Sequence, residues 1–148
     1  MKLVINMNSN ICYIYHYNSK NSPTLTLLKE MAHPQSKLKN SEIAMDKPGH
    51  YNTRESARGA YSPHMEPKEI EIDNFSREVA KELNQERIKK DYDELIIISP
   101  PHVNGLLFKH INNNVKNIII NRIEKDLIQL SEHELLDFLR THAQFPDQ

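Results

Sequence analysis

Two residues that could act in catalysis follow the most apolar run of the chain, at residues 95–98. Ser99 and His102 are of the types that serve as nucleophile and general base. Open α/β sheets bind ligands at the carboxyl ends of their strands, where the N–H groups of a following helix can hold an anion. One hypothesis is therefore a small hydrolase that uses Ser99 or His102. The segment 99–102 lacks the signature of a hydrolase nucleophile and indicates no third triad member, so a structural role in the turn is favoured.

A second group of candidate residues lies in a long polar stretch at residues 33–68. Arginine and aromatic side chains together bind phosphates and stack bases on single-stranded RNA. The alternative is a solvated loop, because charged loop residues are exposed by default. We predict that this loop contacts a protein partner, the ribosome or RNA through some of its residues, namely Lys47, Arg54, Arg58, Gly59 and Tyr61.

Histidines and carboxylates of the chain do not predict a metal site. The separations of His33, His50, His64 and Asp46 match neither zinc-finger nor metalloprotease spacing. The acidic residues at 69, 71 and 73 favour a helix entrance, where carboxylates complement the helix dipole. We expect neither a metal nor a cofactor.

Composition indicates a single domain that needs no disulfide. The chain has 148 residues, 38% hydrophobic and 26% charged, with a formal charge of -1. Such a balance gives no general attraction to nucleic acid or membranes, so any such binding requires a local patch. Cys12 lies in an apolar run, which predicts a buried, inert thiol and a reducing compartment. The apolar runs are too short for a signal peptide or a membrane span, so we expect a soluble, cytoplasmic protein.

The amino-terminal part of the sequence predicts three strands. Residues 2–7 and 11–17 are rich in β-formers and are joined by Asn8, Ser9 and Asn10, which favours an antiparallel hairpin. Residues 24–31 alternate in part and predict the third strand. The long loop at 33–68 follows, beyond the length of ordinary connections.

Helices and strands alternate in the second half. Apolar residues recur at helical spacing over 73–89. The runs at 94–99 and 117–122 predict strands covered on both faces, and the stripe from Val103 to Val115 predicts a helix capped by asparagines. Ser131 and Glu134 form a capping box for a helix at 132–142. Right-handed crossovers then give an α/β fold, a mixed sheet of about five strands in the order β-β-β-loop-α-β-α-β-α.

An ordered set of short segments resembles the bacterial host attachment protein family. These segments are residues 31–34 (Met-Ala-His-Pro), 45–49 (Met-Asp-Lys-Pro-Gly), 66–68, 75–80, 95–100 and 124–127. The resemblance covers nearly the whole chain, from the first predicted strand to the last predicted helix. The resemblance implies a fold similar to the middle domain of archaeal and eukaryotic peptide-chain release factors.

One departure from the release factors concerns catalysis. Their loop carries Gly-Gly-Gln, which assists water attack on peptidyl-tRNA, whereas residues 56–61 read Ser-Ala-Arg-Gly-Ala-Tyr. No glutamine lies between Gln35 and Gln85. Peptidyl-tRNA hydrolysis is therefore not implied.

The sequence thus favours a non-enzymatic binding protein that the resemblance links to attachment to host cells. The alternatives are an RNA- or ribosome-associated factor of translation quality control without Gly-Gly-Gln, and the small hydrolase. The sequence identifies neither the partner nor the oligomeric state.

Overall fold

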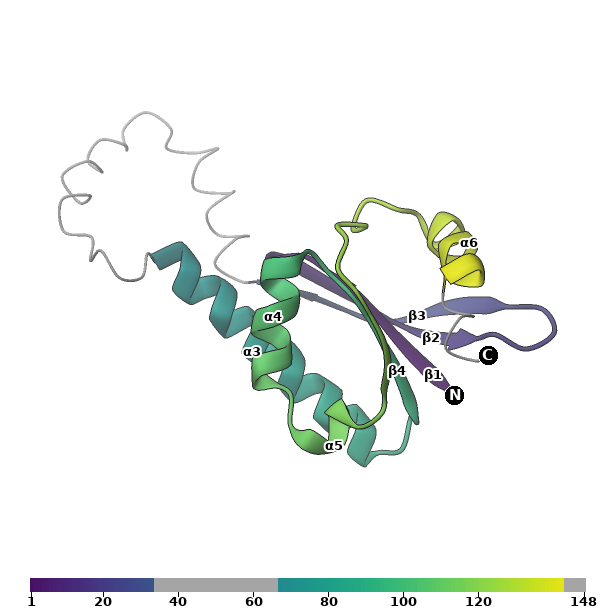
Figure 1. The fold of residues 1–148 in the computed structure, drawn as a ribbon, viewed down its shortest axis with the longest axis horizontal. Helices are drawn as coiled ribbons and strands as arrows, with labels where there is room; N and C mark the ends of the chain where they lie inside the picture. Colours follow the sequence, from purple (N-terminus) through teal and green to yellow (C-terminus); the bar gives the residue numbers. More distant parts are fainter. Residues whose placement is uncertain (34–66, 143–148) are drawn as a thin grey trace.

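The computed structural model describes residues 1–33 and 67–142 and places them in a mixed five-stranded sheet with helices on both faces (Figure 1). The strands are β1 Lys2–Met7, β2 Ile11–Asn18, β3 Thr24–Ala32, β4 Glu94–Ile98 and β5 Ile119–Ile123. The helices of the described part are α3 Pro67–Ile88, α4 Pro101–His110, α5 Asn113–Lys116 and α6 Glu132–His142. The predicted α/β class is confirmed, and α5 is an additional short helix. The likeness to release factors stays a prediction.

The strands follow the spatial order β3-β2-β1-β4-β5. β1 pairs in parallel with β4, and β4 with β5, whereas β1, β2 and β3 form an antiparallel meander. Between β1 and β2, the side-chain oxygen of Asn8 accepts hydrogen bonds from the N–H groups of Asn10 and Ile11. This is an Asx-type turn, and it closes the predicted hairpin.

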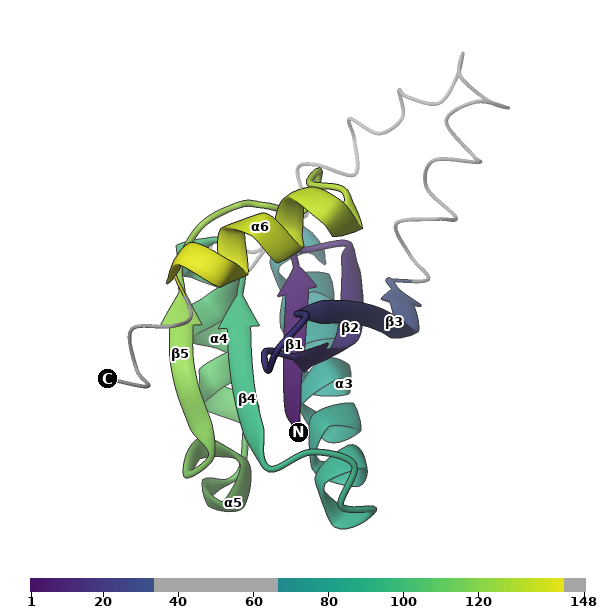
Figure 2. The ribbon, with the colours of Figure 1, turned by 90° about the vertical axis from the view of Figure 1, so that its right-hand side faces the viewer.

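Helices α3, α4 and α5 pack on one face of the sheet and α6 on the other (Figure 2). The first core joins alternate residues of β1 and β4 to the three helices, through Leu3, Ile5, Leu95, Ile97, Val79, Leu83, Leu107 and Val115. The second joins the remaining alternate residues to α6, through Val4, Tyr15, Ile96, Ile98, Leu135 and Leu139. Residues 95–98 are at most 1% exposed, as predicted for a strand covered on both faces.

Several predicted boundaries are wrong by a few residues. Helix α3 begins at Pro67, six residues before the predicted start, because proline suits the first helical turn. The predicted helix through Val115 is two helices. Ile111 is extended, and Asn112 does not take the left-handed conformation: it has φ -80° and its side chain accepts a hydrogen bond from the N–H of Val115. Asn112 therefore starts α5 instead of ending α4.

The predicted strand at 117–122 forms as β5, but the prediction that it is covered on both faces is wrong, because β5 is an edge strand of the described sheet and Ile123 is its one buried residue. The predicted capping box of α6 and the buried Cys12 are confirmed. The N–H of Ser131 donates to Glu134 Oε1 at 2.8 Å, and the N–H of Glu134 donates to Ser131 Oγ at 3.1 Å, which completes the capping box of α6. Cys12 is fully buried, and burial raises the pKa of its thiol far above the usual range. Within residues 1–33 and 67–142, no helix is long and apolar enough to cross a membrane.

Candidate functional site

The carboxyl ends of β1 and β4 lie side by side at the centre of the sheet, and the chain leaves them in opposite directions, toward β2 and toward β5. This is the place where open sheets bind ligands. Ser99 lies here, fully buried, and its hydroxyl has no hydrogen-bond partner in the described part of the chain. His102 points elsewhere, with 60% of its side chain exposed. The two candidate residues of the hydrolase hypothesis are therefore not joined by a hydrogen bond.

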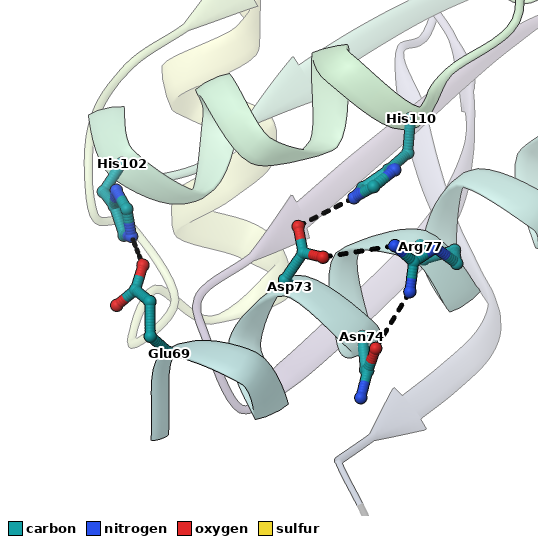
Figure 3. Close-up of polar contacts among 6 residues, drawn as sticks. All are labelled: Glu69, Asp73, Asn74, Arg77, His102 and His110. Carbon is teal, nitrogen blue, oxygen red and sulfur yellow. Dashed lines mark hydrogen bonds and ion pairs between the residues drawn. The ribbon is translucent and has the colours of Figure 1, made fainter. Parts of the chain in front are cut away.

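His102 instead belongs to a polar contact between α3 and α4 (Figure 3). Its Nε2 lies 2.5 Å from Glu69 Oε2. A second pair lies two turns further along α4, where His110 Nε2 donates to Asp73 Oδ1 at 2.8 Å. The two helices run in the same direction on one face of the sheet, so the two histidines of α4 meet two carboxylates of α3.

The pair of Asp73 and His110 is the less exposed of the two, and we call it the inner pair. Asp73 is its centre. Arg77 donates to its second oxygen at 3.2 Å and to Asn74 at 2.9 Å (Figure 3). The hydrogen bond from His110 lowers the pKa of Asp73, burial opposes this, and the charges of His110 and Arg77 lower the pKa further. Asp73 is therefore an ionised group that holds the two helices together.

A histidine held by a carboxylate is the arrangement found beside catalytic nucleophiles. Here the described hydrogen bonds of His102 and His110 are those to Glu69 and Asp73, and no described hydroxyl or thiol reaches either ring. No group of three potential metal ligands occurs in the part of the chain that the structure describes. The arrangement fits a link between helices. The hydrolase hypothesis stays a prediction without supporting geometry.

Three buried side-chain polar atoms near the ends of β1 and β4 lack a hydrogen-bond partner in the described residues. They are Asn6 Oδ1, Ser99 Oγ and Asn104 Nδ2, on side chains that are at most 1% exposed. Asn6 Nδ2 donates to the carbonyl of Leu127 at 3.0 Å, so the segment before α6 closes over the end of β1. Unpaired buried polar groups are costly, which marks this region as a place for ordered water or a ligand.

A cluster of cations surrounds Phe108 at the side of α4 that faces β5. The guanidinium carbon of Arg122 lies 3.9 Å from the ring centroid, and Lys116 Nζ lies 4.5 Å from it. Arg122 Nε donates to Asn104 Oδ1 at 2.9 Å. Cations near an aromatic face are attracted to it, and the hydrogen bond also restrains the guanidinium. This cluster can bind an anion.

The loop candidates Lys47, Arg54, Arg58, Gly59 and Tyr61 lie outside the described residues, and so do His50, His64 and Asp46. His33 lies inside them. It is buried, its Nε2 is 2.9 Å from the carbonyl oxygen of Glu71, and its ring contacts Phe75. Its described contacts thus connect the end of β3 to α3.

The sequence reasoning missed the pairs between α3 and α4. Their signal is helical spacing: Glu69 and Asp73 are four residues apart, and His102 and His110 are eight apart, so each set lies on one side of its helix. This spacing predicts contacts between the carboxylates and the histidines only when α3 and α4 are known to be neighbours. The cluster at Arg122 was missed for the same reason, because its members come from three elements.

Comparison with known proteins identifies relatives of the chain. A family model described as protein required for attachment to host cells matches residues 3–139. An uncharacterized protein of Rickettsia prowazekii (strain Madrid E), RP470, is 31% identical over 81 residues, which cover 53% of this chain and 54% of that protein. The chain thus matches about half of that relative. The Ppx/GppA phosphatase of Aquifex aeolicus aligns with a TM-score of 0.40 and 9% identity, over 83% of this chain and 35% of that one.

Proposed function

Because the chain belongs to the family of proteins required for attachment to host cells, we propose that it is a non-enzymatic binding protein that takes part in such attachment. The family match over residues 3–139 carries the proposal. The described polar side chains agree with it: His102 and His110 are engaged in links between helices, and Ser99 is buried.

The proposal is tested by deleting the gene in the organism that encodes the chain and counting cells attached to a host monolayer. We expect fewer attached cells with unchanged growth in medium, and recovery when the wild-type gene is returned. A gene encoding Arg54→Ala and Arg58→Ala should not restore attachment if the 33–68 loop binds the partner, whereas Lys81→Ala, on the exposed side of α3, should. Normal attachment by the deletion strain would refute the proposal.

The second candidate function is an RNA- or ribosome-associated factor of translation quality control, which would act in the cytoplasm. One observation favours it: the cations at Arg122 and Lys116 have no carboxylate within 4.0 Å among the described residues. The likeness to release factors, which would agree with this function, stays a prediction. Because Gly-Gly-Gln is missing, this function is binding without hydrolysis of peptidyl-tRNA.

Ribosome co-sedimentation tests the second candidate. Since binding to phosphates releases counterions, the fraction bound should be high at low salt and fall steeply as salt rises. Arg54→Ala and Arg58→Ala should lower the fraction bound if the loop also contacts RNA. Absence of the wild-type chain from the ribosome pellet at low salt would exclude this function and leave the attachment proposal in place.

A further inference from the structure

The segment that contains α4, α5 and β5 has no acidic residue of its own. The chain contains 20 aspartates and glutamates, yet none occurs from Leu95 to Ile123. Basic residues in this stretch are Lys109, Lys116 and Arg122, and the asparagines Asn113, Asn114 and Asn117 are exposed beside Lys116. Although the net charge of the chain is -1, this stretch is locally positive. We call the surface formed by Gly105, Phe108, Lys116 and Arg122, together with the buried Asn104 that accepts from Arg122, the basic face.

Arg122 is held in one orientation on the basic face. Phe108 supports its guanidinium group, and Asn104 accepts its Nε–H. Among residues 1–33 and 67–142, no carboxylate approaches its two terminal nitrogens within 4.0 Å. A guanidinium group restrained in this way loses less conformational entropy when it binds an anion.

Lys116 adds a second charge at the same ring. Its ammonium lies 4.5 Å from the Phe108 centroid, against 3.9 Å for Arg122, so the two cations lie close enough to act on one stretch of ligand. The described residues offer Lys116 no ion pair. Two cations near each other repel, and an anion bound between Lys116 and Arg122 would offset this electrostatic repulsion.

Gly105 leaves the basic face open. It is exposed in the middle of α4, three residues before Phe108, and a Cβ atom at this position would meet nothing within 4 Å. Glycine in a helix interior is destabilising relative to alanine. No contact inside the described chain requires it, so a ligand can approach the helix backbone here.

We propose that the basic face binds single-stranded RNA, with Arg122 and Lys116 at the phosphates and the exposed asparagines of α5 at the sugars. Helices α4 and α5 lie against the sheet instead of projecting from it (Figure 2), so the face is suited to a single strand and not to the groove of a duplex. Asparagine amides donate and accept, as the ribose 2′-hydroxyl does, and no described carboxylate lies within 4.0 Å of Arg122 or Lys116 to repel a phosphate. This inference rests on the second candidate function and specifies its surface.

The test is fluorescence anisotropy with the full chain and a labelled RNA of mixed sequence, about 12 nucleotides long, which is within the usual site size. Arg122→Gln with Lys116→Gln should weaken binding roughly tenfold or more at low salt and reduce the salt slope by about 1.4, since each lost phosphate contact removes about 0.7. Lys81→Gln removes a charge on α3 and should leave both values unchanged.

Gly105 provides a second test that spares the packing around Phe108. Gly105→Glu places a negative charge on the basic face and should weaken binding several-fold, whereas Gly105→Gln, of equal size, should weaken it much less. Thermal melts establish that each variant is folded, and the open space at Gly105 favours folding of both. These two variants test the proposal even if Arg122→Gln does not fold.

The outcomes separate the surface from the function. If all of these variants bind the RNA with wild-type affinity, the basic face is not the binding surface, and the second candidate function is unaffected. A wild type that binds neither this RNA nor ribosomes at low salt would overturn both. Equal affinity and salt slope for DNA of the same sequence would overturn the assignment to RNA.

Discussion

At the residue scale, the two histidine-carboxylate pairs between α3 and α4 differ in their contact with water. The side chains of Asp73 and His110 are 20% and 14% exposed, and those of Glu69 and His102 are 38% and 60% exposed. Exposed ion pairs contribute little to stability because water screens them. The inner pair should therefore contribute most of the stability that these contacts supply.

Asp73→Asn tests the inner pair. His110 and Arg77 hold the pKa of Asp73 below its usual 3.8, so the stabilisation is present above that pH and is lost as the pH falls through the lowered pKa. We expect the free energy of unfolding to drop by about 1–2 kcal/mol near neutral pH, with a smaller difference near pH 3. Urea denaturation at both pH values measures this. Glu69→Gln should cost less, and an equal loss at both pH values would contradict the electrostatic account.

Glu86 shows the opposite dependence on pH. Its side chain is 16% exposed, and the hydrogen bond with Asp91, burial and the hydrogen bond with Glu82 raise its pKa to about 7, against the charge of Lys89. Between its usual pKa of 4.5 and about 7 the folded chain binds a proton that the unfolded chain does not. The free energy of unfolding should therefore fall as the pH rises across this window.

Glu86→Gln removes the charge and keeps a hydrogen-bonding group. We expect the melting temperature to rise by roughly 2–4 °C near pH 8, and to match the wild type near pH 4. Calorimetry across this range measures both. A variant that is less stable than the wild type near pH 8 would show that the ionised carboxylate is stabilising instead.

At the element scale, α6 is the helix that covers the second face of the sheet in the described structure. A helix of 11 residues is unstable alone, so its start and its packed leucines decide whether it forms. Ser131→Ala removes the hydroxyl that accepts from the N–H of Glu134 and should cost about 1 kcal/mol. In the Ser131→Ala variant, hydrogen exchange of the α6 amides should be faster than in the wild type, and exchange of the α4 amides should change less. Ser131→Thr keeps a hydroxyl and should retain the protection of α6. Uniformly faster exchange in both helices would mean that α6 does not open separately.

The elements that the sequence predicted are those whose signals are local. Residues 95–98 predicted a covered strand from their apolar run, and Ser131 with Glu134 predicted the start of α6 from a capping pattern. The break at Ile111 was not predictable, because the apolar stripe continues through Val115 into α5. The pairs of α3 with α4 and the basic face depend on which elements are neighbours, and this information comes from the sheet order.

At the scale of the whole molecule, the sheet ends in β3 on one side, where nine residues form a long edge strand. Leu27 and Leu28 are 42% and 43% exposed, and no described strand pairs with the outer side of β3. A register shift opposite Ile14 and Tyr15 leaves Leu28 without a partner, which is a bulge. Bulges make an edge less suited to pairing, but exposed leucines favour it.

We expect this edge to cause self-association at high concentration, and Leu27→Lys to reduce it, because a lysine on an edge strand opposes pairing with another strand. Sedimentation velocity over a range of concentrations measures the effect as a return of the average mass toward that of the monomer. Ile88→Lys is the matched control, since Ile88 is 61% exposed at the end of α3 and its replacement changes charge and apolar surface in the same way. If both variants reduce association equally, general repulsion and not the β3 edge is responsible, because both substitutions replace an exposed aliphatic side chain with lysine but only Leu27 lies on the edge strand.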